Sequence, residues 1–242
     1  MTVTTQSPLL EVSDVHTYYG DSYVLQGISL QINPGQTVGI MGRNGVGKTT
    51  LLRSIVGFTP PSRGRVLFKG NNIAGMAAHR IRKLGIGLVP QGRRVFSGLT
   101  VRENLELAAR APRAGESESW SVQAALQFFP RLSERTRHLG GKLSGGEQQM
   151  LASVRPLVAP SELLLLDEPT EGLAPMMVRD LLSLVGGLKA KGHAMLLVEQ
   201  SLDTLVELAD YIYVIDHGVV AWQGPPAKLS NDEAAKAAHL GL

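Results

Sequence analysis

Residues 42–49 of this 242-residue chain combine glycines, a lysine and a threonine at a spacing that suits phosphate binding. The run reads Gly42-Arg43-Asn44-Gly45-Val46-Gly47-Lys48-Thr49 and matches the pattern G-x-x-x-x-G-K-[ST], known as a phosphate loop. Its glycines permit tight turns in which backbone N–H groups converge on phosphate oxygens. We expect Lys48 to reach the β- and γ-phosphates of a nucleotide and the Thr49 hydroxyl to bind Mg²⁺.

The residues on either side of this loop predict the strand and the helix that a phosphate loop needs. Residues 36–41 are typical of a short buried strand that enters the loop, and residues 49–56 are typical of a helix that leaves it. The N-terminus of that helix, which includes Thr50, would direct unpaired N–H groups and the positive end of its dipole at the phosphates. A glycine-rich turn that binds nothing is the alternative, and the flanking elements disfavour it.

Two adjacent carboxylates, Asp167 and Glu168, follow the four consecutive leucines of residues 163–166. Such an apolar run is typical of a strand buried on both faces, whose carboxyl end carries the chemistry. We expect Asp167 to hold Mg²⁺ through a water molecule and Glu168 to polarise the water that attacks the γ-phosphate. A structural ion-pair site is the alternative, and the phosphate loop in the same chain makes it the weaker interpretation.

The composition indicates an ordinary globular protein, with 43% hydrophobic residues and a net charge of +3. The longest apolar runs, such as residues 163–166 and 194–198, are far shorter than the ~20 residues of a membrane-spanning helix. Residues 1–8 lack the features of a secretory signal, so we expect a cytosolic protein. The absence of cysteine excludes disulfides and thiolate metal sites, and the modest charge does not require a nucleic-acid partner.

The apolar patterning elsewhere predicts an α/β fold with an inserted helical sublobe. Short strands are expected at residues 9–15, 28–32, 64–68, 86–90, 163–166 and 194–198. The first three would form a small β layer beside the loop, and the others would lie in a buried sheet. Helices are expected from residue 101 to about residue 139, interrupted by a loop at residues 112–120, and in a short segment at residues 234–238.

A second motif, at residues 143–147, makes the sequence resemble the ATP-binding cassette (ABC) ATPases over essentially its whole length. The residues Leu143-Ser144-Gly145-Gly146-Glu147 match the signature motif of that family. The resemblance implies that this helix N-terminus binds the γ-phosphate of an ATP held by the opposite subunit, so that two cassettes enclose two nucleotides. Read locally, the motif is a helix start capped by Ser144, and the two interpretations are compatible.

The resemblance also implies an architecture and further nucleotide contacts. The architecture is a RecA-like core with an N-terminal antiparallel β layer, residues 1–242 forming one nucleotide-binding domain with a helical sublobe at about residues 95–155. Gln91 fits the residue that contacts Mg²⁺ and the attacking water and links them to the sublobe. Tyr19 fits the aromatic residue that stacks on adenine, with Tyr18 and Tyr23 as nearby alternatives.

Gln200 stands where most members of the family have a histidine, after the last catalytic strand. We expect it to donate a hydrogen bond to the γ-phosphate, and general acid–base chemistry then depends on Glu168 because glutamine does not titrate. The alternative is that Gln200 only caps a helix that begins at Ser201.

The chain also has Ala174 where many members of the family have an aspartate. With Gln200 and Ala174 the sequence resembles the branched-chain amino-acid importer branch, and most closely its LivF-type subunit. The ATPases of urea and short-amide importers and of lipopolysaccharide exporters are the alternatives. Cassette proteins of DNA repair or translation need a long coiled coil or a second cassette, for which this chain has no room. An unrelated phosphate-loop GTPase or kinase would not account for residues 143–147.

The resemblance therefore implies an ATP-hydrolysing, energy-coupling subunit that uses ATP and Mg²⁺. Its expected partners are a second cassette subunit, identical or different, membrane permease subunits and, indirectly, a solute-binding protein. Such a subunit would be cytoplasmic and peripheral on the inner face of the cell membrane. We expect a helix of the permease to dock around Arg94, Phe96, Leu99 and Arg102, which follow Gln91.

Overall fold

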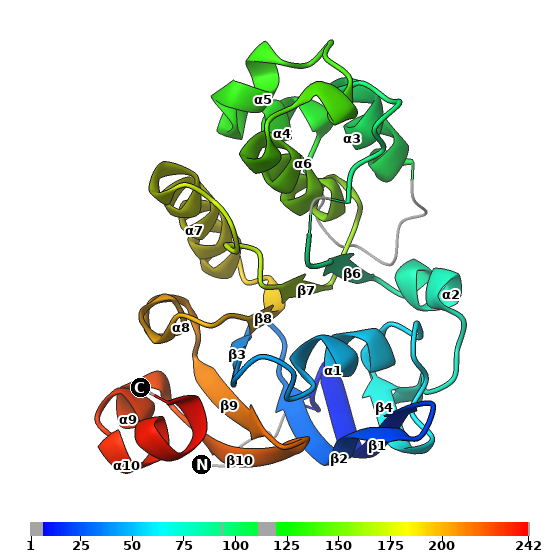
Figure 1. The fold of residues 1–242 in the computed structure, drawn as a ribbon. Coiled ribbons are helices and arrows are strands. Elements are labelled where there is room, and N and C mark those ends of the chain that lie inside the picture. Colours follow the sequence, from blue (N-terminus) through cyan, green and yellow to red (C-terminus); the bar gives the residue numbers. More distant parts are fainter. Residues whose placement is uncertain (1–6, 93, 111–119, 242) are drawn as a thin grey trace, which may run out of the picture.

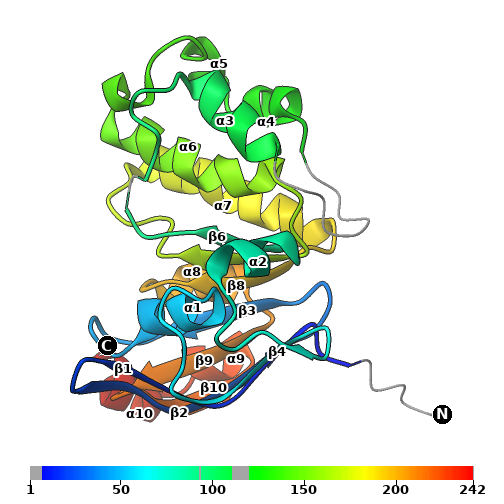
Figure 2. The same cartoon turned by 90° about the vertical axis from the view of Figure 1, so that its right-hand side faces the viewer.

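The computed structural model describes residues 7–92, 94–110 and 120–241. These residues form two lobes in Figure 1, and Figure 2 shows the same two lobes after a 90° turn. The lower lobe contains two β-sheets and the helix α1 (Lys48–Ile55), and the upper lobe contains the helices α3 to α6. This arrangement confirms the predicted α/β fold with a separate helical sublobe.

The smaller sheet is antiparallel, with the strand order β2-β1-β4-β5. Its strands are β1 (Leu10–Tyr19), β2 (Ser22–Ile32), β4 (Arg63–Phe68) and β5 (Asn71–Asn72). In β2 the buried residues Leu25, Ile28, Leu30 and Ile32 all belong to one apolar cluster, so one face of the sheet packs on the core. The predicted β layer is confirmed, although β1 and β2 extend further than expected and meet in a hairpin at residues 20–21.

The larger sheet has the order β10-β9-β3-β8-β7-β6. Its strands are β3 (Thr37–Met41), β6 (Ile86–Val89), β7 (Leu163–Asp167), β8 (Ala194–Val198), β9 (Tyr211–Asp216) and β10 (Val219–Gly224). All neighbours pair in parallel except β9 and β10. Because parallel strands point the same way, the carboxyl ends of β3, β7 and β8 meet at one edge of the sheet.

The helical lobe consists of α3 (Val101–Ala109), α4 (Val122–Phe128), α5 (Pro130–Glu134) and α6 (Gly145–Val158). The N-terminus of α3 is fixed by a capping box, in which Thr100 and Glu103 bond each other's backbone N–H groups. Buried leucines from these helices, among them Leu105, Leu126 and Leu151, share one core with β7 and β8. Most of the loop predicted at residues 112–120 lies outside the described residues.

Further helices pack on the parallel sheet or form the C-terminal part of the chain. They are α2 (Ala78–Lys83), α7 (Pro175–Ala190), α8 (Leu202–Leu208), α9 (Pro226–Ser230) and α10 (Glu233–Ala235), followed by a π-helical turn at Lys236–Leu240. The short helix predicted at residues 234–238 is therefore confirmed in position. Within the described ranges, no helix combines the length and the apolar character needed to cross a bilayer.

Candidate active site

The phosphate loop connects the end of β3 to the first turn of α1, and its glycines are required by close contacts. Gly42, Gly45 and Gly47 all have positive φ angles, of 149°, 84° and 112°. A Cβ atom on Gly42 would lie 2.2 Å from the carbonyl oxygen of Ile215, and one on Gly47 would lie 2.8 Å from Leu25. No other residue type would fit at these two positions without a shift of the backbone or the core. The predicted strand–loop–helix unit is confirmed.

Lys48 lies over this loop and is almost fully buried. Its Nζ atom donates to the carbonyl oxygens of Gly42, at 2.8 Å, and Arg43, at 3.2 Å, and lies 3.3 Å from Oε1 of Glu168. A cavity of about 220 Å³ opens beside it. The cavity is lined by Asn44, Gly45, Gly47, Lys48, Thr49, Thr50, Gln91 and Glu168. The structure therefore brings the loop together with two side chains that are distant in the sequence.

Thr49 and Asp167 form an oxygen-rich pair at the same edge of the sheet. The Thr49 hydroxyl donates to Oδ1 of Asp167 at 3.2 Å. Burial raises the pKa of the Asp167 carboxyl, and the hydrogen bond from Thr49 opposes that effect. A hydroxyl and a buried carboxylate are ligands that suit Mg²⁺, which binds proteins through one or two carboxylates together with substrate phosphates. The residues present therefore fit the metal.

Glu168 is the point at which the predicted catalytic residues converge. The Nε2 atoms of Gln91 and Gln200 donate to its Oε2 at 3.3 Å and 2.8 Å, and Lys48 faces its other oxygen. Its φ angle is +46°, an uncommon value for a residue other than glycine. Such backbone strain persists where the surrounding structure holds a residue in a functional geometry.

The alternative interpretation of Gln200, as a helix cap, is wrong. The helix α8 begins at Leu202, and its cap is Ser201, whose hydroxyl accepts a hydrogen bond from the backbone N–H of Thr204 at 3.2 Å. Gln200 is thus free of that task, and its amide faces Glu168 instead.

Two acidic residues of this region were not predicted. Glu199 is buried, which raises the pKa of its carboxyl, and it accepts hydrogen bonds from the Thr170 hydroxyl at 2.9 Å and the Thr170 N–H at 3.3 Å. Glu171 accepts a hydrogen bond from Gln91 at 2.9 Å. The position of Glu199 directly after a buried strand could have identified it, whereas Glu171 has no comparable signal.

The signature residues lie at the N-terminus of α6, where Ser144 is the cap. Ser144 and Glu147 form a capping box: the Ser144 N–H donates to Glu147 at 2.7 Å, and the Glu147 N–H donates to the Ser144 hydroxyl at 3.3 Å. A Cβ atom on Gly146 would lie 2.3 Å from the sulfur of Met177 in α7, so a larger residue there would displace the Met177 side chain. None of Ser144, Gly145, Gly146 and Glu147 lines the cavity at the phosphate loop, and Figure 1 shows α6 and α1 in different lobes.

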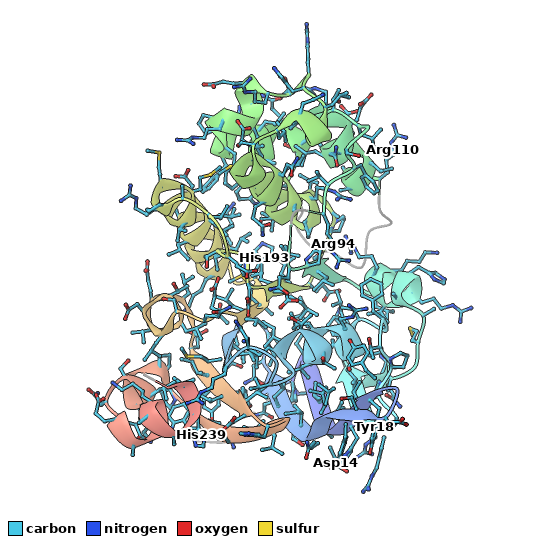
Figure 3. The ribbon with its side chains drawn as sticks, in the orientation of Figure 1. Asp14, Tyr18, Arg94, Arg110, His193 and His239 are labelled. Carbon is cyan, nitrogen blue, oxygen red and sulfur yellow. The ribbon has the colours of Figure 1, made fainter. Side chains whose placement is uncertain are left out.

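Tyr19 ends β1 on the side of the sheet that leads to α1. Its ring is 43% exposed, and its hydroxyl lies 3.1 Å from that of Thr59, which follows α1. Tyr18, labelled in Figure 3, and Tyr23 instead stack on each other, with 4.5 Å between ring centroids. Of the three tyrosines, Tyr19 is therefore the one placed toward the helix that leaves the phosphate loop.

Comparisons with known proteins agree with this geometry. Residues 25–171 match the family model described as ABC transporter. The chain is 37% identical to the high-affinity branched-chain amino acid transport ATP-binding protein BraG of Pseudomonas aeruginosa, over 96% of this chain and all of the relative. It is 34% identical to the probable branched-chain amino acid transport ATP-binding protein LivF of Archaeoglobus fulgidus, over 97% and 99%. A solved ATP-binding subunit of an ABC transporter superposes with a TM-score of 0.81 at 29% identity, covering 96% of each chain. The chain belongs to the ABC transporter family and is one of its ATP-binding, ATP-hydrolysing subunits.

Proposed function

We propose that this subunit drives an importer of branched-chain amino acids. The convergence of Lys48, Gln91 and Gln200 on Glu168, next to the phosphate loop, supports ATP hydrolysis as the energy source. The names of the two relatives above supply the solute class. They do not favour the alternatives, which are urea or short-amide import and lipopolysaccharide export.

In the proposed reaction, Glu168 orients a water molecule and accepts its proton as the water oxygen attacks the γ-phosphorus and the bond to the β-phosphate oxygen breaks. The amides of Gln91 and Gln200 hold the Glu168 carboxylate in place and can turn to the water and the γ-phosphate. Lys48 and the N–H groups at the start of α1 hold the phosphates. Thr49, Asp167 and Gln91 would hold Mg²⁺, which supplies charge neutralisation between the β- and γ-phosphates.

We further propose that residues 1–242 act as one nucleotide-binding domain, with the helical sublobe at about residues 95–155. Tyr19 would stack on the adenine of the nucleotide held by the same chain. Ser144, Gly145, Gly146 and Glu147 would contact the γ-phosphate of a nucleotide held by a second cassette, because a helix N-terminus attracts anions. The position of the signature in the other lobe supports this assignment.

The permease subunits would dock on the groove between α2 and α6, a cavity of about 520 Å³, and the protein would thereby lie at the inner face of the membrane. Arg94, labelled in Figure 3, lines this groove, and Arg155 lies with its guanidinium 4.3 Å from the centre of the Phe96 ring beside it. Leu99 and Arg102, which we expected there, do not line the groove; Arg102 instead faces Glu106 at 3.7 Å, one turn along α3. Arg82 contributes from α2.

Uptake by membrane vesicles that contain the assembled transporter tests the solute class. We expect ATP-dependent accumulation of radiolabelled leucine, isoleucine or valine, and none with Glu168→Gln. Accumulation of urea in place of these amino acids, or ATP-dependent movement of lipid only, would contradict the proposal. The chain, alone or mixed with the other cassette subunit of its transporter, should hydrolyse ATP in either case, so the enzyme assignment is tested separately.

A further inference from the structure

The C-terminal residues 226–241 fold back toward the phosphate loop. Leu229 is fully buried and Leu240 packs on the same apolar core, so both ends of this segment are anchored. The π-helical turn contacts β9, the strand next to β3. Nothing in the reaction proposed above uses this segment.

One contact joins the segment to the end of β9. Nδ1 of His239 lies 3.1 Å from Oδ2 of Asp216, the last residue of that strand, and Figure 3 shows His239 at this end of the molecule. The hydrogen bond from His239 is the main reason why the pKa of Asp216 is lowered. The preceding residue, Ile215, is the one whose carbonyl oxygen lies against Gly42 of the phosphate loop.

A second contact joins the segment directly to the loop. Gly241 adopts a left-handed conformation, with a φ angle of +74°, and its N–H closes the π-helical turn on the carbonyl of Lys236 at 3.0 Å. A Cβ atom on Gly241 would lie 2.9 Å from Nη2 of Arg43, so the guanidinium rests against this glycine. The carbonyl of Arg43 accepts a hydrogen bond from Lys48. The exposed Arg43 side chain therefore lies against the C-terminal turn, while its backbone carbonyl is bonded by the phosphate-binding lysine.

We propose that His239 is a positioning residue for the phosphate loop. By bonding Asp216 it keeps residues 236–241 against Arg43, and the loop is thereby held in its nucleotide-binding conformation before the nucleotide arrives. A preformed loop loses less conformational freedom on binding, which raises affinity without changing the chemical step. This inference rests on the proposed binding of nucleotide phosphates by residues 42–50.

The test is calorimetric titration of the full chain with MgADP, together with steady-state ATP hydrolysis. His239→Ala removes the bond to Asp216, and His239→Asn restores a donor at almost the same place. His217→Asn is the matched control, because His217 also bonds Asp216, at 2.8 Å, but is 92% exposed and holds no other element. Its φ angle is +47°, which asparagine tolerates.

We expect His239→Ala to weaken MgADP binding by about three- to tenfold, the size of one hydrogen bond, and to raise KM for ATP with little change in kcat. His239→Asn should recover most of the affinity, and His217→Asn should match the wild type. An unchanged dissociation constant in His239→Ala, or an equal loss in His217→Asn, would overturn the inference.

Two further measurements keep these outcomes distinct. If His239→Ala does not fold, Gly241→Ala replaces it, since alanine is strained at a φ angle of +74° and its Cβ would lie against the Arg43 guanidinium, which loosens the turn; unchanged MgADP binding there overturns the inference. Lys48→Ala is titrated alongside. If the wild type binds MgADP no better than Lys48→Ala, the proposed nucleotide site is wrong, and the positioning role fails with it.

Discussion

The phosphate loop and the signature both contain glycines and lie at the start of a helix. Among the described residues, catalytic side chains from other parts of the chain converge at the phosphate loop and not at the signature. At the phosphate loop, side chains from β7, β8 and the Gln91 loop converge around Lys48 and Glu168. At the signature, the interactions of Ser144 and Glu147 within the described part of the chain cap the helix or stabilise its own lobe. The phosphate loop is thus joined by catalytic groups of its own chain, whereas the described contacts at the start of α6 are its own cap and an ion pair with Arg135 of the same lobe. Such a difference is what the proposed pairing of two cassettes requires.

The comparison is tested most strongly at Glu168. Glu168→Gln should retain MgATP binding and lose about 10²- to 10⁴-fold in turnover, because positioning survives while the proton acceptor is lost. Steady-state hydrolysis and ATP titration measure the two effects separately. Glu162→Gln, a change just before the same strand and away from the cavity, is the control and should hydrolyse ATP normally. Wild-type turnover in Glu168→Gln would remove Glu168 from the mechanism.

A substitution at Gly146 tests whether the signature is needed for turnover but not for nucleotide binding by its own chain. Gly146→Ala places a methyl group at the N-terminus of α6, where the Met177 side chain must move to accommodate it, so turnover should fall by about tenfold or more. MgADP binding should not change, since the signature does not line the cavity of its own chain. Gly187→Ala in α7, where an added Cβ meets nothing, should leave both quantities unchanged. Weakened MgADP binding in Gly146→Ala would place both motifs in one site.

Substitutions at Gln200 test whether its hydrogen bond to Glu168 contributes to hydrolysis at the phosphate-loop site. Gln200→Ala should lower turnover by about tenfold with little change in ATP affinity, because one donor to Glu168 and the γ-phosphate is lost. Gln200→His should retain substantial turnover, since histidine can also donate there. Full activity of Gln200→Ala, measured with the permease present, would show that its bond to Glu168 has no role in hydrolysis.

A substitution at Asp167 tests whether the buried carboxylate at the phosphate-loop site lowers the stability of the folded chain. Burial raises the pKa of Asp167, so its contribution to stability is present below the unfolded-state pKa and is lost as the pH rises through the folded-state value. Asp167→Asn should therefore raise the melting temperature at neutral pH by about 2–4 °C, the effect of about 1 kcal/mol in a chain of this size, and the gain should shrink in acid. Turnover should fall at the same time. Asp21→Asn, at an exposed turn, should change neither. A lower melting temperature in Asp167→Asn would refute the burial argument.

Much of the site could be predicted from sequence because its residues follow strands with strong local patterns. The phosphate loop, Asp167, Glu168 and Gln200 each begin within two residues of the end of a buried apolar run, and parallel strands bring such positions to one edge. The contacts of Glu171 and of His239 with Asp216 could not be predicted, because they join residues far apart in the sequence that no periodicity relates.

The unpredicted elements differ in kind. The helix α7 carries a recognisable pattern, with Pro175 at its start and buried residues Leu181, Leu184 and Leu188 at helical spacing, so its absence from the predicted elements has no physical cause. By contrast, β10 is an edge strand with mostly half-exposed residues, and only its pairing with β9 defines it. Weak local patterning thus accounts for the missed edge strand β10, but not for the missed helix α7.

The central claim, that ATP is bound between the phosphate loop of this chain and the signature of a second cassette, is tested most directly by light scattering. The Glu168→Gln chain is measured with and without MgATP, alone and mixed with the other cassette subunit of its transporter. We predict a particle of two cassettes that forms only with MgATP in at least one of these samples, and that is lost when Gly146→Ala is added to Glu168→Gln. Bound MgATP with no dimer in any sample, or a dimer that persists with Gly146→Ala, would contradict the claim.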